Sequence, residues 1–452
     1  MAFKRKIYRK LLEWKDSCHG CKAILVEGAR RIGKSTIVEE FAKNEYESYI
    51  LIDFNDVSDR ILKNFDENLS DLDTFFMLLS AEYGVTLKRR KSAIIFDEIQ
   101  RFPKARQAIK KLVKDGRYDY IETGSLVSIK ENVKDITIPS EERSVKMYPM
   151  DFEEFAWVLG EEKLIEYIRL CFEKKAPLED GFHKKASLLF RQYMLVGGMP
   201  QSVAAFVDND RNFEMSDVEK RDILAMYRND IMKIGARYKS RVLSIYDQIP
   251  AFLSQHEKRV RLSDVAEGSS IDQYSDTFFW LGDSMIANEC FNCTDPSIAL
   301  AMNENRTAVK CYMGDTGLLV SLAFDANVIA DEKLYKQILN DKISLNEGML
   351  YENIVAQMLT CNGHKLFFYN RYNEVLHRND IEVDFLLAKQ GVSKYKLYPI
   401  EVKSTKRYAT KSLDAFIEKY GKFVDVAYIV HPKNLEKKGR ILCIPDYMAM
   451  CL

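Results

Sequence analysis

The chain has 452 residues, of which 47% are apolar and 30% charged, and such a length and composition indicate a soluble globular protein of about three domains. Its 67 basic and 67 acidic residues cancel, which excludes a strong whole-chain electrostatic field for nucleic acid. No apolar run reaches the roughly 18–20 residues of a membrane span, and the basic N-terminus lacks the apolar segment of a signal peptide, so we expect a cytoplasmic protein without a membrane partner.

Nine cysteines are scattered along the chain, and an odd, dispersed set of this kind does not indicate a disulfide framework. Two pairs have the CxxC spacing of many zinc sites, Cys18/Cys21 and Cys290/Cys293. The pairs are far apart in the sequence, and the second falls in an expected strand. We therefore favour free, partly buried thiols over a four-cysteine metal site.

The first motif joins an apolar strand, residues 23–26, to a helical pattern that begins near residue 34. Between them the sequence reads Gly-x-x-x-x-Gly-Lys-Ser, the phosphate-binding loop (P-loop, or Walker A motif), in the strand-to-helix context that it requires. The glycines let several backbone N–H groups point at one anion, and the helix adds the positive end of its dipole. We predict that ATP is bound by Gly28, Ala29, Arg30, Arg31, Ile32, Gly33, Lys34, Ser35 and Thr36.

Two of these side chains have the chemistry of a hydrolytic site. Lys34 is expected to reach the β- and γ-phosphates, and the Ser35 hydroxyl is expected to hold Mg²⁺. The alternative, a glycine-containing turn that binds nothing, is disfavoured because the motif and its strand–helix context agree.

A second motif follows in an apolar run, residues 92–96, which ends in the adjacent carboxylates Asp97 and Glu98, as a Walker B strand does. A buried parallel strand reads as a continuous apolar run, and ligands bind beyond its carboxyl end. Asp97 is therefore placed to support the Mg²⁺ shell and Glu98 to act as general base for the attacking water. A strand that ends in an acidic turn without chemistry is the alternative.

The next expected strand begins at residue 118 and ends in small hydroxyl residues. Thr123 or Ser125 is placed to sense the γ-phosphate, and a plain strand-to-loop turn is the alternative reading of this stretch.

These motifs resemble the AAA-type ATPases in the branch with an extra strand between the P-loop and the acidic strand. More closely, the chain resembles a prokaryotic ATP-binding family whose signature includes Asp-Glu-Ile-Gln, present here as residues 97–100. By this resemblance Arg143 stands where an arginine that contacts the γ-phosphate is expected. The family has glycine where this chain has Glu142, so a surface arginine in an acidic loop is the alternative.

The middle of the chain is expected to hold two further domains. Residues 151–235 are rich in helix signals and contain Gly197-Gly198-Met199-Pro200, which resembles another family signature; we expect a helical lid over the nucleotide. Residues 236–325 suggest a winged helix, with helices over 262–266 and 271–281 and a wing from strands over 285–293 and 308–313. The second helix carries Asp272 and Asp276 and no basic residue, which favours a protein partner over DNA; the basic run 258–261 is the counter-evidence.

The C-terminal segment, residues 340–452, has the expected order α-β-β-β-α-β. Asp384 and Glu401 lie on consecutive strands, and Glu401 and Lys403 share one strand face by period two. Residues 341–452 hold 17 Lys/Arg and 13 Asp/Glu, a net charge of +4, which permits nucleic-acid contact.

This arrangement resembles the restriction-endonuclease-like superfamily, the PD-(D/E)xK nucleases, although Val383 stands where the motif has proline. The resemblance implies that Glu352, Asp384 and Glu401 hold Mg²⁺ and that Lys403 orients water or stabilises the pentavalent phosphate. Two alternatives stay open: a charged, alternating strand edge, and a nuclease-like fold without nuclease activity.

The sequence thus predicts an α/β protein with four parts: a P-loop AAA-type parallel-sheet domain (1–150), a helical lid (151–235), a winged-helix-like domain (236–325) and a PD-(D/E)xK nuclease-like domain (340–452). The expected function is Mg²⁺-dependent ATP hydrolysis coupled to a C-terminal domain that acts on nucleic acid. The alternative is an ATP-driven regulatory switch that binds protein partners and uses the C-terminal fold as a scaffold. Oligomers are possible in either case.

Overall fold

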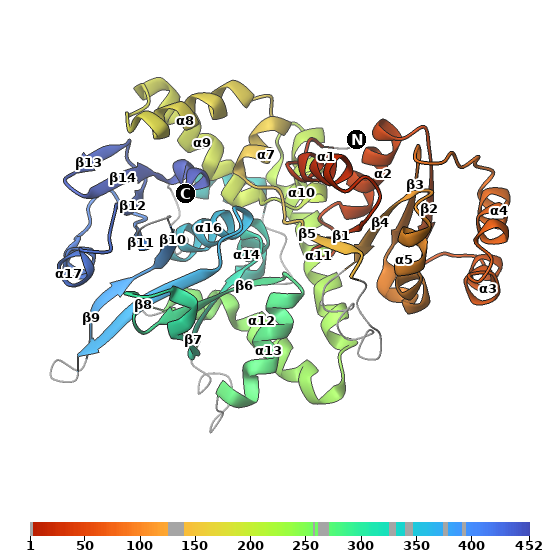
Figure 1. The fold of residues 1–452 in the computed structure, drawn as a ribbon. Helices are drawn as coiled ribbons and strands as arrows, with labels where there is room; N and C mark the ends of the chain where they lie inside the picture. The colour runs from red at the N-terminus through yellow and green to blue at the C-terminus, as the bar shows by residue number, and fades with distance from the viewer. Residues whose placement is uncertain are drawn as a thin grey trace. The chain divides into compact units, whose positions relative to one another are not determined.

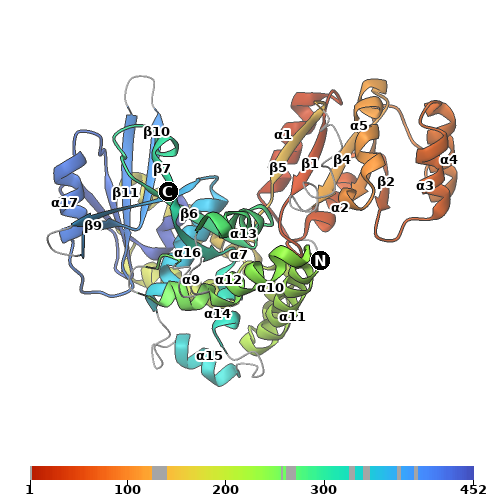
Figure 2. The ribbon, with the colours of Figure 1, turned by 90° about the horizontal axis from the view of Figure 1, so that it is seen from below.

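A computed structural model of the protein describes residues 3–124, 140–255, 258–260, 271–324, 331–339, 347–373, 378–390 and 395–452. The chain divides into two compact units, Met1–Tyr148 and Pro149–Leu452, and each unit is described by itself (Figures 1 and 2). In the described part of the chain, no helix is long and apolar enough to cross a membrane.

The first unit is built on a five-stranded parallel sheet. Its strands are β1 (Ala23–Glu27), β2 (Ser48–Asp53), β3 (Ser92–Asp97), β4 (Asp119–Gly124) and β5 (Glu142–Lys146). Their order in the sheet is β2-β3-β4-β1-β5, so β4 lies between the strand that leads to the P-loop and the strand that carries the two carboxylates. All residues of β1, β3 and β4 are buried, as expected for central parallel strands covered on both faces.

The helices of this unit are α1 (Ile7–Cys18), α2 (Lys34–Glu45), α3 (Asp59–Glu67), α4 (Leu72–Tyr83) and α5 (Pro103–Asp115). Aromatic side chains join α3 and α4 to the sheet: Phe65 contacts Phe75 and Phe96 edge-on, with ring centroids 5.0 Å and 5.9 Å apart. Local signals set the ends of α4, where Asp71 caps the first turn and Gly84 ends the helix at φ 63°.

The second unit begins with a series of helices. They are α7 (Phe152–Val158), α8 (Glu162–Lys174), α9 (Asp180–Val196), α10 (Pro200–Asp208), α11 (Phe213–Met232) and α12 (Ala236–Ser254). Asp151 and Glu154 form a reciprocal capping box at the start of α7, which explains the acidic residues of that run. The remaining helices are α13 (Ile271–Asp283), α14 (Thr316–Ala323), α15 (Glu332–Leu339), α16 (Glu347–Cys361) and α17 (Lys411–Tyr420).

Two sheets complete the second unit. The first has the order β7-β6-β8-β9, from β6 (Ala287–Cys293), β7 (Glu304–Met313), β8 (Leu366–Asn373) and β9 (Arg378–Val383). The second has the order β10-β11-β12-β14-β13, from β10 (Phe385–Gln390), β11 (Tyr395–Val402), β12 (Ala427–His431), β14 (Ile441–Pro445) and β13 (Glu436–Lys438). A single residue, Asp384, separates β9 from β10, so the chain leaves one sheet and enters the other there.

The strands expected as the wing of a winged helix are present but have an additional neighbour. β6 and β7 pair antiparallel, as in a wing, and β6 also pairs parallel with β8 of the C-terminal segment. The second expected helix is α13, whereas the helix expected over 262–266 lies outside the described residues. The 236–325 and 340–452 segments therefore share one sheet.

The Gly-Gly signature after α9 marks a close approach of two backbones. The Gly198 N–H donates to Asp315 Oδ2 at 2.6 Å, and a Cβ on Gly198 would lie 1.9 Å from the Met150 carbonyl oxygen. Asp315 is buried and also caps α14 through the Leu318 N–H. A side chain at position 198 would therefore force apart the segments that start α7, end α9 and start α14.

Candidate functional site

The P-loop lies between β1 and α2, at the carboxyl edge of the first sheet. A Cβ on Gly28 would lie 2.4 Å from both the Met147 carbonyl oxygen and Ile32 Cδ1, and Gly33 has φ 91°. Glycine is therefore required at position 28 for space and favoured at position 33 for backbone conformation.

Lys34 is directed into this loop. Its side chain is buried, and Nζ donates to the carbonyl oxygens of Gly28 at 3.1 Å and Ala29 at 2.9 Å. Burial lowers the pKa of Lys34, while the carboxylates of Glu98 and Asp97 act in the opposite direction. The ammonium is thus held by exchangeable carbonyl contacts at the place where phosphate oxygens are expected.

Ser35 and Asp97 meet at the end of the acidic strand. Ser35 Oγ donates to Asp97 Oδ1 at 2.8 Å, and Thr123 Oγ1 of the adjacent strand donates to the same oxygen. A hydroxyl beside a carboxylate supplies the hard oxygen atoms that Mg²⁺ prefers, so these residues fit this ion. The sequence positions 35, 97 and 123 are therefore brought together.

Glu98 is held in an unusual backbone conformation. It has φ 53° and ψ 46°, which a residue other than glycine rarely adopts. Its N–H donates to Thr123 Oγ1 at 3.2 Å, and Gln100 Nε2 donates to its Oε2. The Asp-Glu-Ile-Gln signature thus has a physical explanation, since Gln100 orients the carboxylate of Glu98.

Arg5, which the sequence analysis does not single out, supports the P-loop from outside the motif. This buried side chain donates to the carbonyl oxygens of Ile32 at 2.9 Å and Tyr148 at 2.7 Å. The only sequence signal at Arg5 is the basic character of the N-terminal stretch, and many surface helices share it.

Arg143 lies far from the P-loop of its own chain. It is exposed on the edge strand β5 and pairs with Ile24 near the start of β1, whereas the P-loop follows the end of β1. The start of the P-loop is four strand residues beyond the level of Arg143, a distance of about 13 Å at about 3.3 Å per residue. Neighbouring Glu142 forms a buried ion pair with Arg106 at 2.9 Å, which explains this departure from the family glycine.

Ser125, the other hydroxyl residue expected near the γ-phosphate, lies outside the described residues.

The second cluster of interest surrounds Glu352 on α16. This buried carboxylate accepts from Lys310 Nζ at 3.0 Å and from Tyr312 Oη through Oε1, and from Lys258 Nζ through Oε2. Burial opposes its ionisation, yet Lys310 and Lys258 lower the pKa of Glu352 to about 2. Glu352 is therefore a charged, fully bonded group inside the second unit.

Asp384 stands at the junction between the two sheets and close to Glu352. Its Oδ2 accepts the Val402 N–H at 2.8 Å, and Lys310 Nζ lies 3.7 Å from its Oδ1. Burial raises the pKa of Asp384, and the Glu352 carboxylate adds to this shift. Lys310 Nζ also lies 3.9 Å from Glu382 Oε1, so three carboxylates surround one ammonium group.

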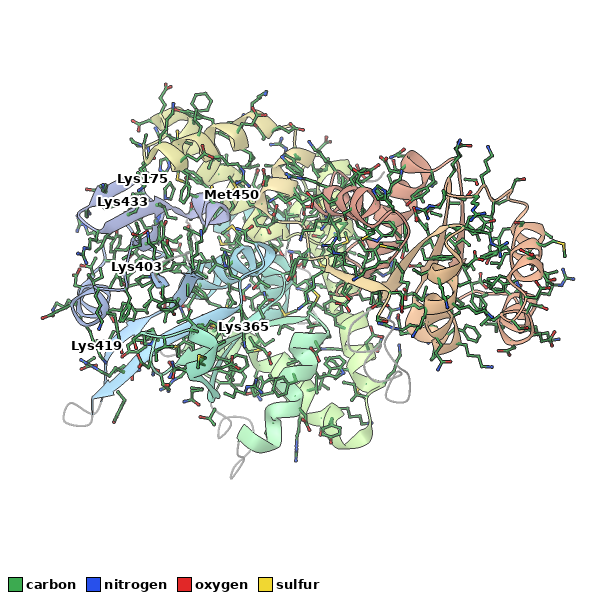
Figure 3. The ribbon with its side chains drawn as sticks, in the orientation of Figure 1. Lys175, Lys365, Lys403, Lys419, Lys433 and Met450 are labelled. Carbon is green, nitrogen blue, oxygen red and sulfur yellow. The ribbon has the colours of Figure 1, made fainter. Side chains whose placement is uncertain are left out.

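Lys403 lies just after the end of β11 (Figure 3). Its Nζ lies 2.5 Å from Glu401 Oε1. Burial and the nearby Asp384 raise the pKa of Glu401 to about 7, against the effect of Lys403. Sequence positions 352, 384, 401 and 403 therefore belong to one region of the fold.

The four residues do not, however, form the expected metal site. No group of three or more acidic, histidine or cysteine side chains is placed to hold a metal ion in the described part of the chain. Lys310, which the motif does not include, places its ammonium among Glu352, Asp384 and Glu382. As they lie, these carboxylates have a lysine where the metal ion is expected.

The paired cysteines are not arranged for metal binding either. None of the nine cysteines forms a disulfide in the described chain, and Cys290 and Cys293 are buried on β6. Residues three apart on a strand point to opposite faces, so these two thiols diverge. Burial raises the pKa of both thiols, that of Cys293 to about 11.

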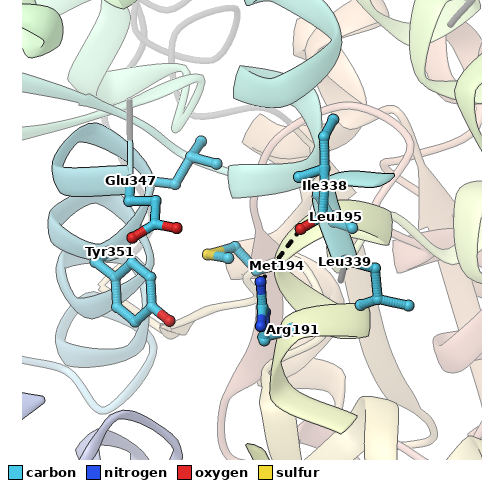
Figure 4. Close-up of a pocket in the computed structure, with 8 residues that line it drawn as sticks. Arg191, Met194, Leu195, Ile338, Leu339, Glu347 and Tyr351 are labelled. Atoms are coloured by element: carbon cyan, nitrogen blue, oxygen red, sulfur yellow. Dashed lines mark hydrogen bonds between the residues drawn. The ribbon is translucent and has the colours of Figure 1, made fainter. Parts of the chain in front are cut away.

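A small hollow opens between α9, α15 and α16 (Figure 4). Arg191 and Met194 face Glu347 and Tyr351 across it, and Arg191 Nη2 donates to the Ile338 carbonyl oxygen at 3.2 Å. The chain between α15 and α16 lies outside the described residues. We therefore assign no ligand to this hollow.

Comparison with known proteins identifies three regions of the chain. Residues 21–156 match a family model described as an AAA domain. Residues 187–328 match a domain of unknown function (DUF8612), and residues 347–447 match another (DUF4143).

No curated protein matches the chain. Among solved structures, the chain is similar to Cdc6p from Pyrobaculum aerophilum at 12% identity, over 75% of this chain and 96% of that chain, with a TM-score of 0.26. At that TM-score the likeness carries no structural argument. Residues 21–156 are thus similar to AAA domains, and this similarity supports ATP binding by the P-loop.

Proposed function

We propose that the protein is a Mg²⁺-dependent ATPase whose hydrolytic site lies in the first unit. The observation that carries this proposal is the contact between Ser35 Oγ and Asp97 Oδ1 at 2.8 Å. It joins the P-loop serine to the acidic strand at the edge where parallel sheets bind nucleotides.

Each residue has a distinct task in the proposed reaction. Lys34 exchanges its loop carbonyls for the β- and γ-phosphates. Ser35 and Asp97 would hold Mg²⁺, which supplies charge neutralisation on the phosphates when bound. Glu98 accepts the proton of the attacking water, oriented by Gln100. Hydrolysis then proceeds at a site where the base Glu98 directly follows Asp97, one of the two proposed metal ligands, at the end of β3.

Two variants and their matched controls test this assignment. Lys34→Ala is expected to abolish ATP binding measured by calorimetry, whereas Lys43→Ala, exposed on the same helix, is expected to bind normally. Glu98→Gln is expected to bind ATP and hydrolyse it about 10²–10⁴-fold more slowly. Glu67→Gln, an exposed position, is its control. Full ATP affinity in the Lys34 variant would contradict the proposal.

For the second unit we propose a nuclease-like architecture in residues 340–452. The supporting order is α16, then β8 to β11, then α17 and β12, with β10 and β11 antiparallel and β11 and β12 parallel. The proposal also gives residues 236–325 a winged-helix-like character and a protein partner. It gives residues 151–235 the role of a lid and the protein a cytoplasmic location.

Two outputs are compatible with ATP hydrolysis: action on nucleic acid, and a regulatory switch on a nuclease-like scaffold. The contacts of Lys310 with Glu352 and Asp384 favour the second, because the carboxylates already have a counter-ion. Wild type and Asp384→Ala, incubated with DNA and RNA and with Mg²⁺ or Mn²⁺, distinguish them. Cleavage that depends on Asp384 would support the first output, and its absence the second.

A further inference from the structure

We propose that the Lys310 ammonium takes the place of a divalent cation in the C-terminal carboxylate cluster, so that the nuclease-like domain holds no metal ion there. This inference rests on the nuclease-like architecture proposed above. It concerns a residue outside the four-residue motif and outside the 340–452 segment, since Lys310 belongs to β7.

The position of Lys310 is that of a central counter-ion. Its Nζ lies 3.0 Å from Glu352 Oε1, 3.7 Å from Asp384 Oδ1 and 3.9 Å from Glu382 Oε1. These carboxylates come from α16, from β9 and from the junction between the sheets, so Lys310 joins elements far apart in sequence. Carboxylate clusters that hold a metal ion likewise direct several oxygens at one cation.

Both oxygens of Glu352 and one oxygen of Asp384 already have donors, whereas the buried Glu401 Oε2 has no hydrogen-bond partner among the described residues. Glu352 accepts from Tyr312 and Lys258 in addition to Lys310, and Asp384 accepts the Val402 N–H. Lys258 and Lys310 bring two positive charges to the three carboxylates of Glu352, Asp384 and Glu382. A metal ion would have to displace several donors and would also meet the positive charge of the lysines.

Lys310 has no open route away from the cluster. Its side chain is 1% exposed, and its Nζ lies 5.1 Å from the centre of the Phe368 ring. β7 is fixed in the sheet by β6, where Cys290 pairs with Lys310. Withdrawal of the ammonium would require the sheet to open, so the lysine is a permanent part of the cluster rather than a mobile gate.

The test measures Mn²⁺ binding by calorimetry and by electron paramagnetic resonance on the nucleotide-free, full-length protein. The variants are wild type, Asp384→Asn, Lys310→Met, and Lys310→Met combined with Asp384→Asn. Lys389→Met, an exposed lysine on β10, is the matched control. Mn²⁺ bound near Ser35 and Asp97 is common to all five proteins. It is removed by comparing wild type and Lys389→Met with Asp384→Asn, and Lys310→Met with the double variant.

The expected result is no Asp384-dependent Mn²⁺ site in wild type or the control, and a new site in Lys310→Met, at least tenfold tighter than in the double variant. Asp384-dependent binding or phosphodiester cleavage by wild type would overturn the proposal, as would the failure of a folded Lys310→Met protein to gain a site. If Lys310→Met does not fold, Lys310→Gln replaces it. The comparison of wild type with Asp384→Asn still shows whether the cluster binds Mn²⁺. ATP hydrolysis is measured in the same preparations, so a failed ATPase assignment is seen separately.

Discussion

Thr123 Oγ1 donates to Asp97 Oδ1 while accepting the N–H of Glu98 at 3.2 Å, so one hydroxyl of β4 contacts both carboxylate-bearing residues of the acidic strand. Because Thr123 is fully buried, this hydroxyl has no water to replace these bonds. It is therefore a positioning residue for the proposed metal ligand and base.

Thr123→Val, which removes the hydroxyl with little change of volume, is expected to lower kcat for ATP hydrolysis about tenfold, the effect of about one net hydrogen bond. ATP affinity should change little, since the P-loop is untouched. Steady-state kinetics and calorimetry check both values. Thr86→Val, at an exposed position, is the control. An unchanged kcat would contradict the positioning role.

Arg5→Ala is expected to weaken ATP binding about tenfold, because the P-loop loses a charged donor at Ile32. The matched control is Arg9→Ala, since Arg9 is exposed on α1, the helix that begins two residues after Arg5. Calorimetric titration with ATP measures the change. Equal affinities for the two variants would show that Arg5 does not support the loop.

Gly198→Ala is expected to destabilise the second unit by about 3 kcal/mol or more, because the added Cβ would lie 1.9 Å from the Met150 carbonyl oxygen. Gly181→Ala on α9 is the control, since its Cβ meets nothing within 4 Å. That variant is expected to gain about 0.5–1 kcal/mol from the better helix propensity of alanine. Urea unfolding gives both values, and similar stabilities would refute the close approach.

Asp446→Asn tests a predicted pH dependence. Burial raises the pKa of Asp446 from 3.8 to about 7 in the folded protein, against Tyr447, Arg191 and Tyr351, which favour the charged form. Between these pH values the folded state retains a proton that the unfolded state releases, so the free energy of unfolding falls as pH rises. The fall is at most about 1.4 kcal/mol per pH unit.

Asparagine stays neutral at every pH and keeps an oxygen for the Tyr447 N–H. The variant should therefore match wild type in stability near pH 4 and exceed it at pH 8, by up to about 4 kcal/mol. Chemical denaturation at both pH values measures the difference. The exposed Asp222→Asn is the control. A pH-independent difference would show that Asp446 does not carry this proton.

The sequence predicts best those parts of the protein that depend on neighbours along the chain. The P-loop, the strand ending in Asp97 and Glu98, and the helix α13 follow from short motifs and periodicity, which encode local geometry. The match of residues 21–156 to AAA domains supports the P-loop AAA-type domain expected for the first unit.

The contacts that the sequence does not predict depend on packing between residues far apart in the chain. Arg5 reaches the P-loop from 27 residues away, and Lys310 reaches Glu352 from 42 residues away. Nothing in a lysine on a strand indicates which carboxylates it will meet after folding. The metal site at Glu352, Asp384 and Glu401 stays a prediction from motif positions, which do not show the Lys310 cation that lies beside Glu352 and Asp384.

The shared sheet β7-β6-β8-β9 also decides where the chain can be divided. A fragment that begins at residue 340 would lose β6, which leaves β8 with an unpaired edge, and would lose the donors Lys310 and Tyr312. Glu352 would then be a buried charge without its partners. We expect such a fragment to aggregate, whereas a division between Tyr148 and Pro149 leaves both sheets of the second unit intact.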